Sequence, residues 1–325
     1  MEQQIEVRHL VKEYKTIKRS KGILGLLKSL AKPEKVVVKA VDDVSFSIGK
    51  GEIVGYIGPN GAGKSTTIKM MTGIMTPTSG TVSIEEDSPQ KNRKKVVRKL
   101  GVVFGQRSQL YWDLRLGETF ELLKRIYQID DMAYRQTLGE LTELLELGDF
   151  CNTPVRQLSL GQRMRGDLAA AMLHSPSILF LDEPSIGLDI DAKQAIHRFI
   201  SQINQERGVT VLLTTHDLNE VSELCKRLIV INHGRIVEDG ALDGIVRRMS
   251  PYRLMEIETT APRHAIATPL AEFIRQEGNK IYCKFDHRQV TASRVIAELA
   301  KEMEIVDLSV HDPDIEEAVR GIFGT

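Results

Sequence analysis

The sequence of 325 residues has few cysteines and no net charge, and both absences exclude classes of protein. Its three cysteines, Cys151, Cys225 and Cys283, are far apart and form no CxxC pair, so we expect neither a disulfide framework nor a zinc site. Lys and Arg number 44, and Asp and Glu also number 44. Without excess positive charge a nucleic-acid-coating protein loses its main electrostatic attraction, so no nucleic acid is expected as a partner.

Long apolar runs are also missing. The longest are short pieces such as SILFL and VTVLL, whereas a membrane-spanning helix needs about 20 apolar residues. The N-terminal run MEQQIEVRHL has no apolar core after a basic start, so it does not resemble a secretory signal. We therefore predict a chain that does not cross a membrane alone and that belongs in a reducing cytoplasm.

The sequence does contain alternating β-rich and helical segments, which are typical of an α/β domain over about residues 1–240. Near-continuous apolar runs at residues 52–58, 177–182 and 209–215 predict strands buried on both faces of a central sheet. The alternating patterns before them predict an antiparallel flank. A helical pattern between Leu116 and Leu147 predicts a helical insertion, at about residues 107–165.

A second, small α/β domain is predicted at residues 250–325, after the breaker Ser250-Pro251. RLMEIET, KIYCKF and VDLSV have strand patterns. TASRVIAELAKEM is typical of an amphipathic helix, and DPDIEEAVRGIFG of a last helix that begins at Asp312-Pro313.

A basic excursion interrupts the opening strands between Lys15 and Lys35, where Glu34 is the single acidic residue. Four apolar residues recur there at helical spacing: Ile23, Leu26, Leu27 and Leu30. One interpretation is a solvated surface loop with a turn or two of helix. The other is a contact with anionic lipid or with a membrane partner.

A phosphate-binding loop is the strongest motif. Residues 58–65 fit G-x-x-x-x-G-K-[ST], directly after an apolar strand and before a helical run. Glycines allow backbone N–H groups to curl around phosphate oxygens, and the helix N-terminus adds its positive dipole end. The predicted nucleotide-binding residues are Gly58, Pro59, Asn60, Gly61, Ala62, Gly63, Lys64, Ser65 and Thr66. Lys64 would reach the β- and γ-phosphates, and the Ser65 hydroxyl would ligate Mg²⁺.

A pair of carboxylates completes a nucleotide triphosphatase pattern. Asp182 ends the strand ILFLD, where open α/β sheets place their ligand chemistry. We predict that Asp182 holds Mg²⁺ through its water shell. Glu183 follows, and its carboxylate is predicted to polarise the water that attacks the γ-phosphate.

The run LSLGQR at residues 158–163 resembles the signature motif of ATP-binding cassette (ABC) proteins, usually LSGGQ. Alone it is a weak signal, since Ser159 would also be an ordinary helix N-cap. Its place along the chain makes it specific, because the phosphate loop, Gln106, the signature, the Asp182–Glu183 pair and His216 follow in ABC order. The resemblance covers roughly residues 3 to 240 and implies a P-loop ABC cassette that hydrolyses ATP.

The resemblance implies roles for individual residues. In ABC ATPases two cassettes pack head to tail, so Ser159, Gly161 and Gln162 would contact ATP held by the second cassette. His216 matches the switch histidine that contacts the γ-phosphate. Gln106 matches a glutamine that touches Mg²⁺ and the lytic water. Because one chain carries one cassette, a homodimer or a paired ATPase subunit is expected.

Tyr14 is the candidate for the aromatic residue that stacks on adenine. The long excursion that follows it departs from the family's usual spacing, so a core tyrosine is the open alternative. At the signature, Leu160 replaces the first glycine of the usual pair. This replacement and the C-terminal domain resemble the daunorubicin-resistance branch of the family, which implies an exporter.

The segment after Gln106 holds Tyr111 and the only tryptophan, Trp112. These aromatic residues suit a groove for a coupling helix of a membrane permease, or else ordinary packing of the helical insertion. With no spanning helix of its own, the chain is expected to sit on the cytoplasmic face of the membrane beside a separate permease. The alternative is a soluble ABC-class switch on the ribosome or DNA. Against it, there is a single cassette, and no heptads separate Lys64 from Asp182.

Overall fold

The computed structural model describes residues 3–17, 35–105, 107–250, 252–260 and 268–311. The chain forms two compact units, Met1–Asp239 and Gly240–Thr325, and each is described by itself. Among the described helices, none has both the length and the apolar character that crossing a membrane requires.

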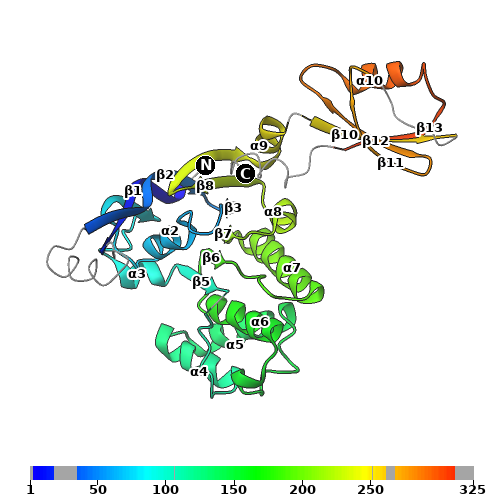
Figure 1. Ribbon diagram of the computed structural model, residues 1–325. Coiled ribbons are helices and arrows are strands. Elements are labelled where there is room, and N and C mark those ends of the chain that lie inside the picture. Colours follow the sequence, from blue (N-terminus) through cyan, green and yellow to red (C-terminus); the bar gives the residue numbers. More distant parts are fainter. Residues whose placement is uncertain (1–2, 18–34, 106, 251, 261–267, 312–325) are drawn as a thin grey trace, which may run out of the picture. The chain divides into compact units, whose positions relative to one another are not determined.

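A six-stranded sheet forms the centre of the first unit (Figure 1). Its strand order is β5 (Leu100–Phe104), β6 (Ile178–Asp182), β7 (Thr210–Thr214), β3 (Ile53–Ile57), β8 (Arg227–Asn232) and β9 (Arg235–Ala241). The pairs β5–β6, β6–β7, β7–β3 and β3–β8 are parallel. Parallel strands point their carboxyl ends toward one edge, so the residues that follow β3, β6 and β7 meet there. The three predicted strands are therefore neighbours in the sheet.

The predicted antiparallel flank is a second sheet, with the order β2 (Lys35–Gly49), β1 (Gln3–Ile17) and β4 (Ser79–Ile84). Its inward residues, such as Ile5 opposite Ile48 and Ile84, join one continuous core with the apolar residues of the central sheet. Because β1 extends to Ile17 and β2 begins at Lys35, both ends of the basic excursion are strand. Residues 18–34, with the four apolar positions of the predicted turn of helix, lie outside the described residues.

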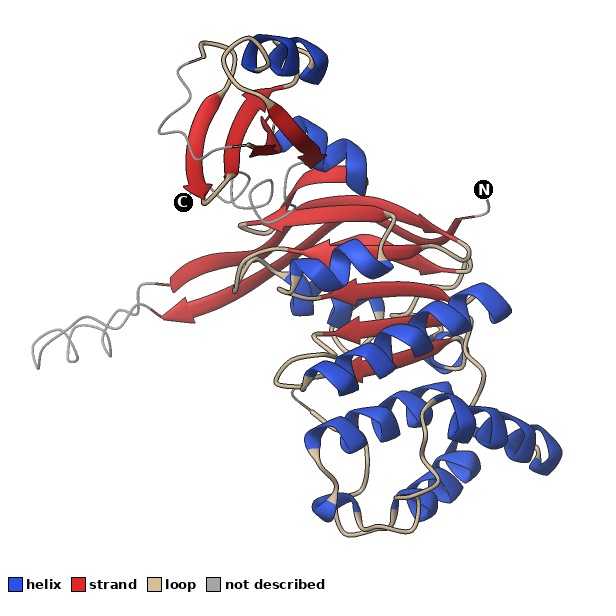
Figure 2. Cartoon of the chain, turned by 90° about the vertical axis from the view of Figure 1, so that its right-hand side faces the viewer, coloured by secondary structure: helices blue, strands red, loops and turns tan. Residues whose placement is uncertain are grey.

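Helices flank the central sheet, and one group stands apart from it (Figures 1 and 2). The helices next to the sheet are α2 (Lys64–Met71), α3 (Arg93–Val97), α7 (Ile190–Arg207) and α8 (Leu218–Leu224). The other group is α4 (Leu116–Tyr127), α5 (Asp131–Leu144), the short 3-10 helix η1 (Val155–Gln157) and α6 (Leu160–Met172). This second group occupies the predicted helical insertion, and α6 extends beyond it toward β6.

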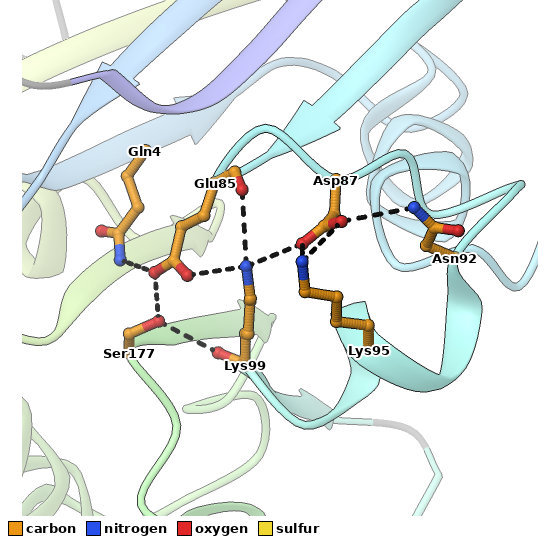
Figure 3. A network of polar contacts seen from close by, with 7 residues as sticks. All are labelled: Gln4, Glu85, Asp87, Asn92, Lys95, Lys99 and Ser177. Atoms are coloured by element: carbon orange, nitrogen blue, oxygen red, sulfur yellow. Dashed lines mark hydrogen bonds and ion pairs between the residues drawn. The ribbon is translucent and has the colours of Figure 1, made fainter.

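A polar network joins the flank to the amino ends of the parallel strands (Figure 3). Lys99, just before β5, bridges to Asp87 at 2.9 Å and to Glu85 at 3.0 Å. Glu85 also accepts hydrogen bonds from Gln4 of β1 and from Ser177, just before β6, each at 2.7 Å. Asp87 takes a second ion pair from Lys95. Each carboxylate here thus has several partners.

The second unit contains α9 (Leu242–Met249) and a four-stranded antiparallel sheet of order β11 (Glu272–Glu277), β12 (Lys280–Asp286), β10 (Tyr252–Thr259) and β13 (Ile305–His311). Helix α10 (Ala292–Leu299) contributes Val295 and Leu299 to its core. The sequence pattern missed β11, because its run EFIRQE is largely charged or polar and forms an edge of the sheet. The predicted last helix, DPDIEEAVRGIFG, lies outside the described residues.

Candidate active site

A cavity of about 1000 Å³ opens at the carboxyl ends of β3, β6 and β7. It brings together the phosphate loop, the acidic pair Asp182 and Glu183, and His216. Of the predicted loop residues the following line it: Gly58, Pro59, Asn60, Gly61, Gly63, Lys64, Ser65 and Thr66. Ala62 is not among its lining residues. It is buried behind the loop, where its N–H donates to the Pro59 carbonyl at 3.1 Å.

The loop needs glycine at two points. A Cβ on Gly58 would lie 2.2 Å from the Ile231 carbonyl oxygen. Gly63 has φ of 109°, and a Cβ there would lie 2.4 Å from the Ala40 carbonyl oxygen. Only glycine allows this close packing, and it delivers the chain into α2 at Lys64 with the helix N-terminus facing the cavity.

The Lys64 ammonium lies inside the curl of the loop. It donates to the Gly58 carbonyl oxygen at 2.6 Å and to that of Pro59 at 3.3 Å. Burial lowers the pKa of Lys64, and the nearby charges of Glu183 and Asp182 partly counter that effect. The two carboxylates thus favour the charged ammonium, which suits it to bind phosphate.

Ser65 and Asp182 meet on the cavity wall, and the Ser65 hydroxyl lies 3.2 Å from Asp182 Oδ1. The Thr214 hydroxyl donates to the same oxygen at 2.6 Å and fixes the carboxylate from the side of β7. A hydroxyl and a carboxylate oxygen are hard oxygen ligands of the kind that Mg²⁺ takes, together with waters and substrate phosphates. The donor set therefore fits that ion.

Glu183 and His216 face each other after adjacent strands, with Glu183 Oε1 3.9 Å from His216 Nδ1. Glu183 has a left-handed φ of 55°, and its N–H donates to the Thr214 carbonyl oxygen at 2.9 Å. Gly105 presses on this turn, because a Cβ there would lie 2.0 Å from the Glu183 carbonyl oxygen. The backbone thus holds a carboxylate and an imidazole together at the cavity, an arrangement suited to moving a proton.

Gln106 and Tyr14 are likewise not placed in the cavity. Gln106 lies outside the described residues, although its neighbours Gly105 and Arg107 line the cavity. Tyr14 of β1 is not among the lining residues, and its hydroxyl contacts the Met75 sulfur at 3.2 Å. Its stacking on adenine stays a prediction.

The signature residues lie away from this cavity, at the start of α6. Ser159 caps the helix, because its hydroxyl accepts from the Gln162 N–H at 3.2 Å while Gln162 accepts from the Ser159 N–H at 2.9 Å. Leu160 is exposed, with its end close to Gly187. The helix N-terminus is therefore presented at the surface of the cassette.

Other residues of the site were not among those predicted from the sequence. Thr214, which holds Asp182, stands in the run TTHD two residues before His216, so its proximity to that histidine was an available signal. The remaining lining residues are Ala40, Lys69, Ile74, Phe104, Gly105, Arg107 and Ile186. Phe104 and Gly105 could have been found as neighbours of Gln106, whereas Ala40 comes from β2 and carries no local signal.

The two aromatic residues of the predicted partner surface are exposed. Trp112 is 54% exposed to solvent and Tyr111 is 44% exposed. The Arg163 guanidinium of α6 lies 5.4 Å from the centre of the Trp112 ring, which ties this surface to the helix that begins at the signature.

Comparisons with known proteins all indicate the same family. The sequence pattern described as "ABC transporter" matches residues 41–186. The ABC transporter ATP-binding protein NatA of Bacillus subtilis is 34% identical over 65% of this chain and 86% of its own length. The methionine import ATP-binding protein MetN of Latilactobacillus sakei is 30% identical over 90% of this chain and 87% of its own. The linearmycin resistance ATP-binding protein LnrL of Bacillus subtilis is 27% identical over 90% and 94%.

Solved structures that resemble this chain belong to the same family. An ATP-binding subunit of an ABC transporter has a TM-score of 0.63 and 28% identity, and the match covers 75% of this chain and 92% of that one. A dimeric ATP-binding cassette in a post-hydrolysis state, bound to ADP and Pi, has a TM-score of 0.61 and 27% identity over 73% and 98% of the two chains.

Proposed function

We propose that this chain powers an exporter whose permease is a separate polypeptide. The premise is that the chain belongs to the ABC transporter ATP-binding proteins and is therefore an ATPase. The observation that carries the assignment of the site is the single cavity in which Lys64, Asp182, Glu183 and His216 converge. They come from three separate parts of the sequence, the phosphate loop, the Asp182–Glu183 pair and the segment after β7. Together they supply a cation, a metal ligand, a base and an imidazole.

The residues divide the work of phosphate binding. The backbone of residues 58–65 and the N-terminus of α2 cradle the phosphates, and Lys64 binds the β- and γ-phosphates. Ser65 and Asp182, with Gln106 as the third predicted ligand, hold Mg²⁺. When bound, that ion neutralises charge on the phosphate oxygens.

Hydrolysis needs a base beside the γ-phosphate. Glu183 accepts the proton of the attacking water at its carboxylate, and His216 donates a hydrogen bond to the γ-phosphate. The Thr214 contacts keep the backbone of Glu183 fixed while the carboxylate acts.

The signature acts on a second cassette. Ser159, Gly161 and Gln162 lie at an exposed helix N-terminus, outside the cavity of their own chain. An exposed N-terminus suits a phosphate that another chain presents. We therefore assign these residues to ATP bound by a partner cassette, in a homodimer or a pair of related subunits. The dimeric relative supports this arrangement.

Replacing Glu183 by Gln tests the catalytic assignment. ATP hydrolysis should fall at least about 100-fold, because the amide cannot take the proton from water, and the protein should elute as a dimer with ATP and Mg²⁺. Glu206→Gln, on the exposed face of α7, serves as the control and should hydrolyse normally. Retention of more than half of the wild-type rate in Glu183→Gln would remove Glu183 as the base.

Export is supported by Leu160 in the signature and by the match to LnrL, a resistance protein, along nearly its whole length. MetN, named as a methionine import protein, matches the same 90% share of the chain and makes import the second candidate. The two separate in cells that express this chain with a permease encoded by a neighbouring gene. Export predicts lower accumulation of linearmycin, and import predicts faster methionine uptake. Glu183→Gln is the inactive control in both assays.

Contact with the permease is assigned to the surface around Trp112. Trp112→Glu should leave basal ATP hydrolysis within about twofold of wild type and abolish its stimulation by the permease. A fall in basal hydrolysis, or in the melting temperature, would instead assign Trp112 to the packing of the helical insertion.

A further inference from the structure

The segments that follow β6 and β7 are bridged twice. At the cavity, Glu183 Oε1 lies 3.9 Å from His216 Nδ1. Deeper in the unit, the Ser185 hydroxyl donates to Glu220 Oε2 at 2.8 Å. The same two segments carry both contacts, because Ser185 is two residues beyond Glu183 and Glu220 is four beyond His216. The inner bridge therefore restricts the separation at the outer one.

Glu220 is anchored on its other side as well. Its side chain is 1% exposed, and Oε1 lies 3.3 Å from Nε2 of His197 on α7. The other ring nitrogen of His197, Nδ1, lies 2.7 Å from Glu223. Burial lowers the pKa of His197, but the hydrogen bonds that its ring donates to Glu220 and Glu223, with the negative charges of these carboxylates, outweigh burial and the net shift is upward. A buried carboxylate with a partner for each oxygen is held in one orientation.

Helix α8 has a further attachment to α7. Asp217 caps α8 by accepting from the Asn219 N–H at 3.1 Å, and its second oxygen accepts from Lys193 of α7 at 2.8 Å. The helix that begins two residues after His216 is thus fixed to α7 at Asp217 and at Glu220.

The Glu183 turn requires such support. Its φ of 55° is disfavoured for a residue with a Cβ, so local backbone preference does not hold the turn. Thr214 holds it from β7, and Ser185 is held by Glu220 from α8.

We propose that Glu220 is a positioning residue for ATP hydrolysis: through Ser185 on one side and His197 on the other, it sets the separation of the Glu183 carboxylate from the His216 ring. This role rests on the proposed functions of Glu183 and His216. Glu220 is buried and is not among the residues that line the cavity, so it acts through its neighbours and not by contact with the substrate.

Three variants test the proposal. Glu220→Gln should lower kcat for ATP about tenfold or more with KM changed less than twofold, because the phosphate loop is untouched. Ser185→Ala removes only the bond to the loop and should lower kcat in the same direction. Glu223→Gln is the matched control: it contacts the same histidine from an exposed position but does not contact Ser185, so its kcat should stay within twofold of wild type.

A double-mutant comparison separates positioning from general stabilisation. If Glu220 acts through Glu183 and His216, adding Glu220→Gln to His216→Ala should lower the residual rate far less than it lowers the wild-type rate. Equal fold-losses in both backgrounds, or a wild-type kcat in folded Glu220→Gln, would overturn the proposal. If Glu220→Gln does not fold, Ser185→Ala decides by the same criteria. An active Glu183→Gln would instead overturn the proposed function, which keeps the two failures distinct.

Discussion

The two ends of the parallel sheet are built differently. At the amino ends, Lys99 reaches Asp87 at 2.9 Å and Glu85 at 3.0 Å, and Glu85 has further partners on β1 and before β6 (Figure 3). At the carboxyl ends, Glu183 Oε1 and His216 Nδ1 are 3.9 Å apart. Within the described part of the chain, the Lys64 ammonium donates hydrogen bonds to carbonyl oxygens of its own loop and to no carboxylate. Charges are satisfied internally at the amino end, whereas at the carboxyl end they are directed into a cavity.

This difference separates stability from chemistry within one sheet. A charge whose partners are all protein groups contributes to folding, and its loss should lower the free energy of unfolding. A charge held toward a cavity contributes to binding, and its loss should change activity while leaving the fold intact. A substitution at the amino ends should therefore lower the free energy of unfolding and leave activity unchanged, and one at the carboxyl ends should do the reverse.

The largest effect is expected for Lys64→Ala. ATP hydrolysis should fall about 1000-fold, since the phosphate loop loses the buried cation assigned to the β- and γ-phosphates, with the melting temperature changed by less than about 2 °C. Steady-state hydrolysis and thermal melting measure the two quantities. Lys50→Ala, an exposed lysine before β3, is the control for loss of a positive charge. Persistent hydrolysis in Lys64→Ala would place phosphate binding elsewhere.

Mixing two inactive variants tests whether the exposed signature completes the cavity of a partner. Ser159→Arg should be inactive because it blocks the signature, although it retains the phosphate loop. Mixed in equal amounts with Lys64→Ala, it should restore about a quarter of wild-type hydrolysis, because half of the dimers are hybrids with one intact site each. No recovery in verified hybrid dimers would mean that the signature serves its own chain.

Lys99→Met addresses the amino end. It should lower the free energy of unfolding by about 1 kcal/mol, a modest value because the network is partly exposed to solvent. Hydrolysis per folded molecule should be unchanged. Lys94→Met, at an exposed neighbouring lysine, should have no effect in the same urea titration. If Lys99→Met is as stable as wild type, the network does not hold the two sheets together.

The smallest effect is a pH dependence of stability. Hydrogen bonds from Lys95 and Lys99 lower the pKa of Asp87 to about 2 from a usual 3.8. A carboxylate with a lowered folded pKa stabilises the fold above its unfolded pKa, and that contribution is lost as the pH falls toward the folded pKa. Urea unfolding from about pH 5 to about pH 3 should show this loss, with a shallower slope in Lys99→Met. An identical slope in the two proteins would show that Lys99 does not set this pKa.

Much of the cassette could be predicted because its motifs are local. The phosphate loop and the Asp182–Glu183 pair at the end of β6 each occupy consecutive residues, and the apolar strands that carry them determine where they meet. Contacts between distant segments could not be predicted. The hydrogen bond from Thr214 to Asp182 and the position of Ala40 in the cavity wall depend on strand register. The hydrogen bond from Ser185 to Glu220 depends on how the helices pack. The edge strand β11 was not predicted, because an exposed edge strand can form with few apolar residues.

Gly105 has a consequence for engineering this cassette. Since a Cβ at this position would lie 2.0 Å from the Glu183 carbonyl oxygen, main chain packs directly on main chain there. A shift of the strand end at residue 105 would reach the Glu183 turn without a side chain in between. Substitutions at position 105 could not adjust how far such a shift moves the Glu183 turn, because every side chain other than hydrogen would displace the turn. Variants designed to alter the coupling of this ATPase will have to change the segments on either side of the contact.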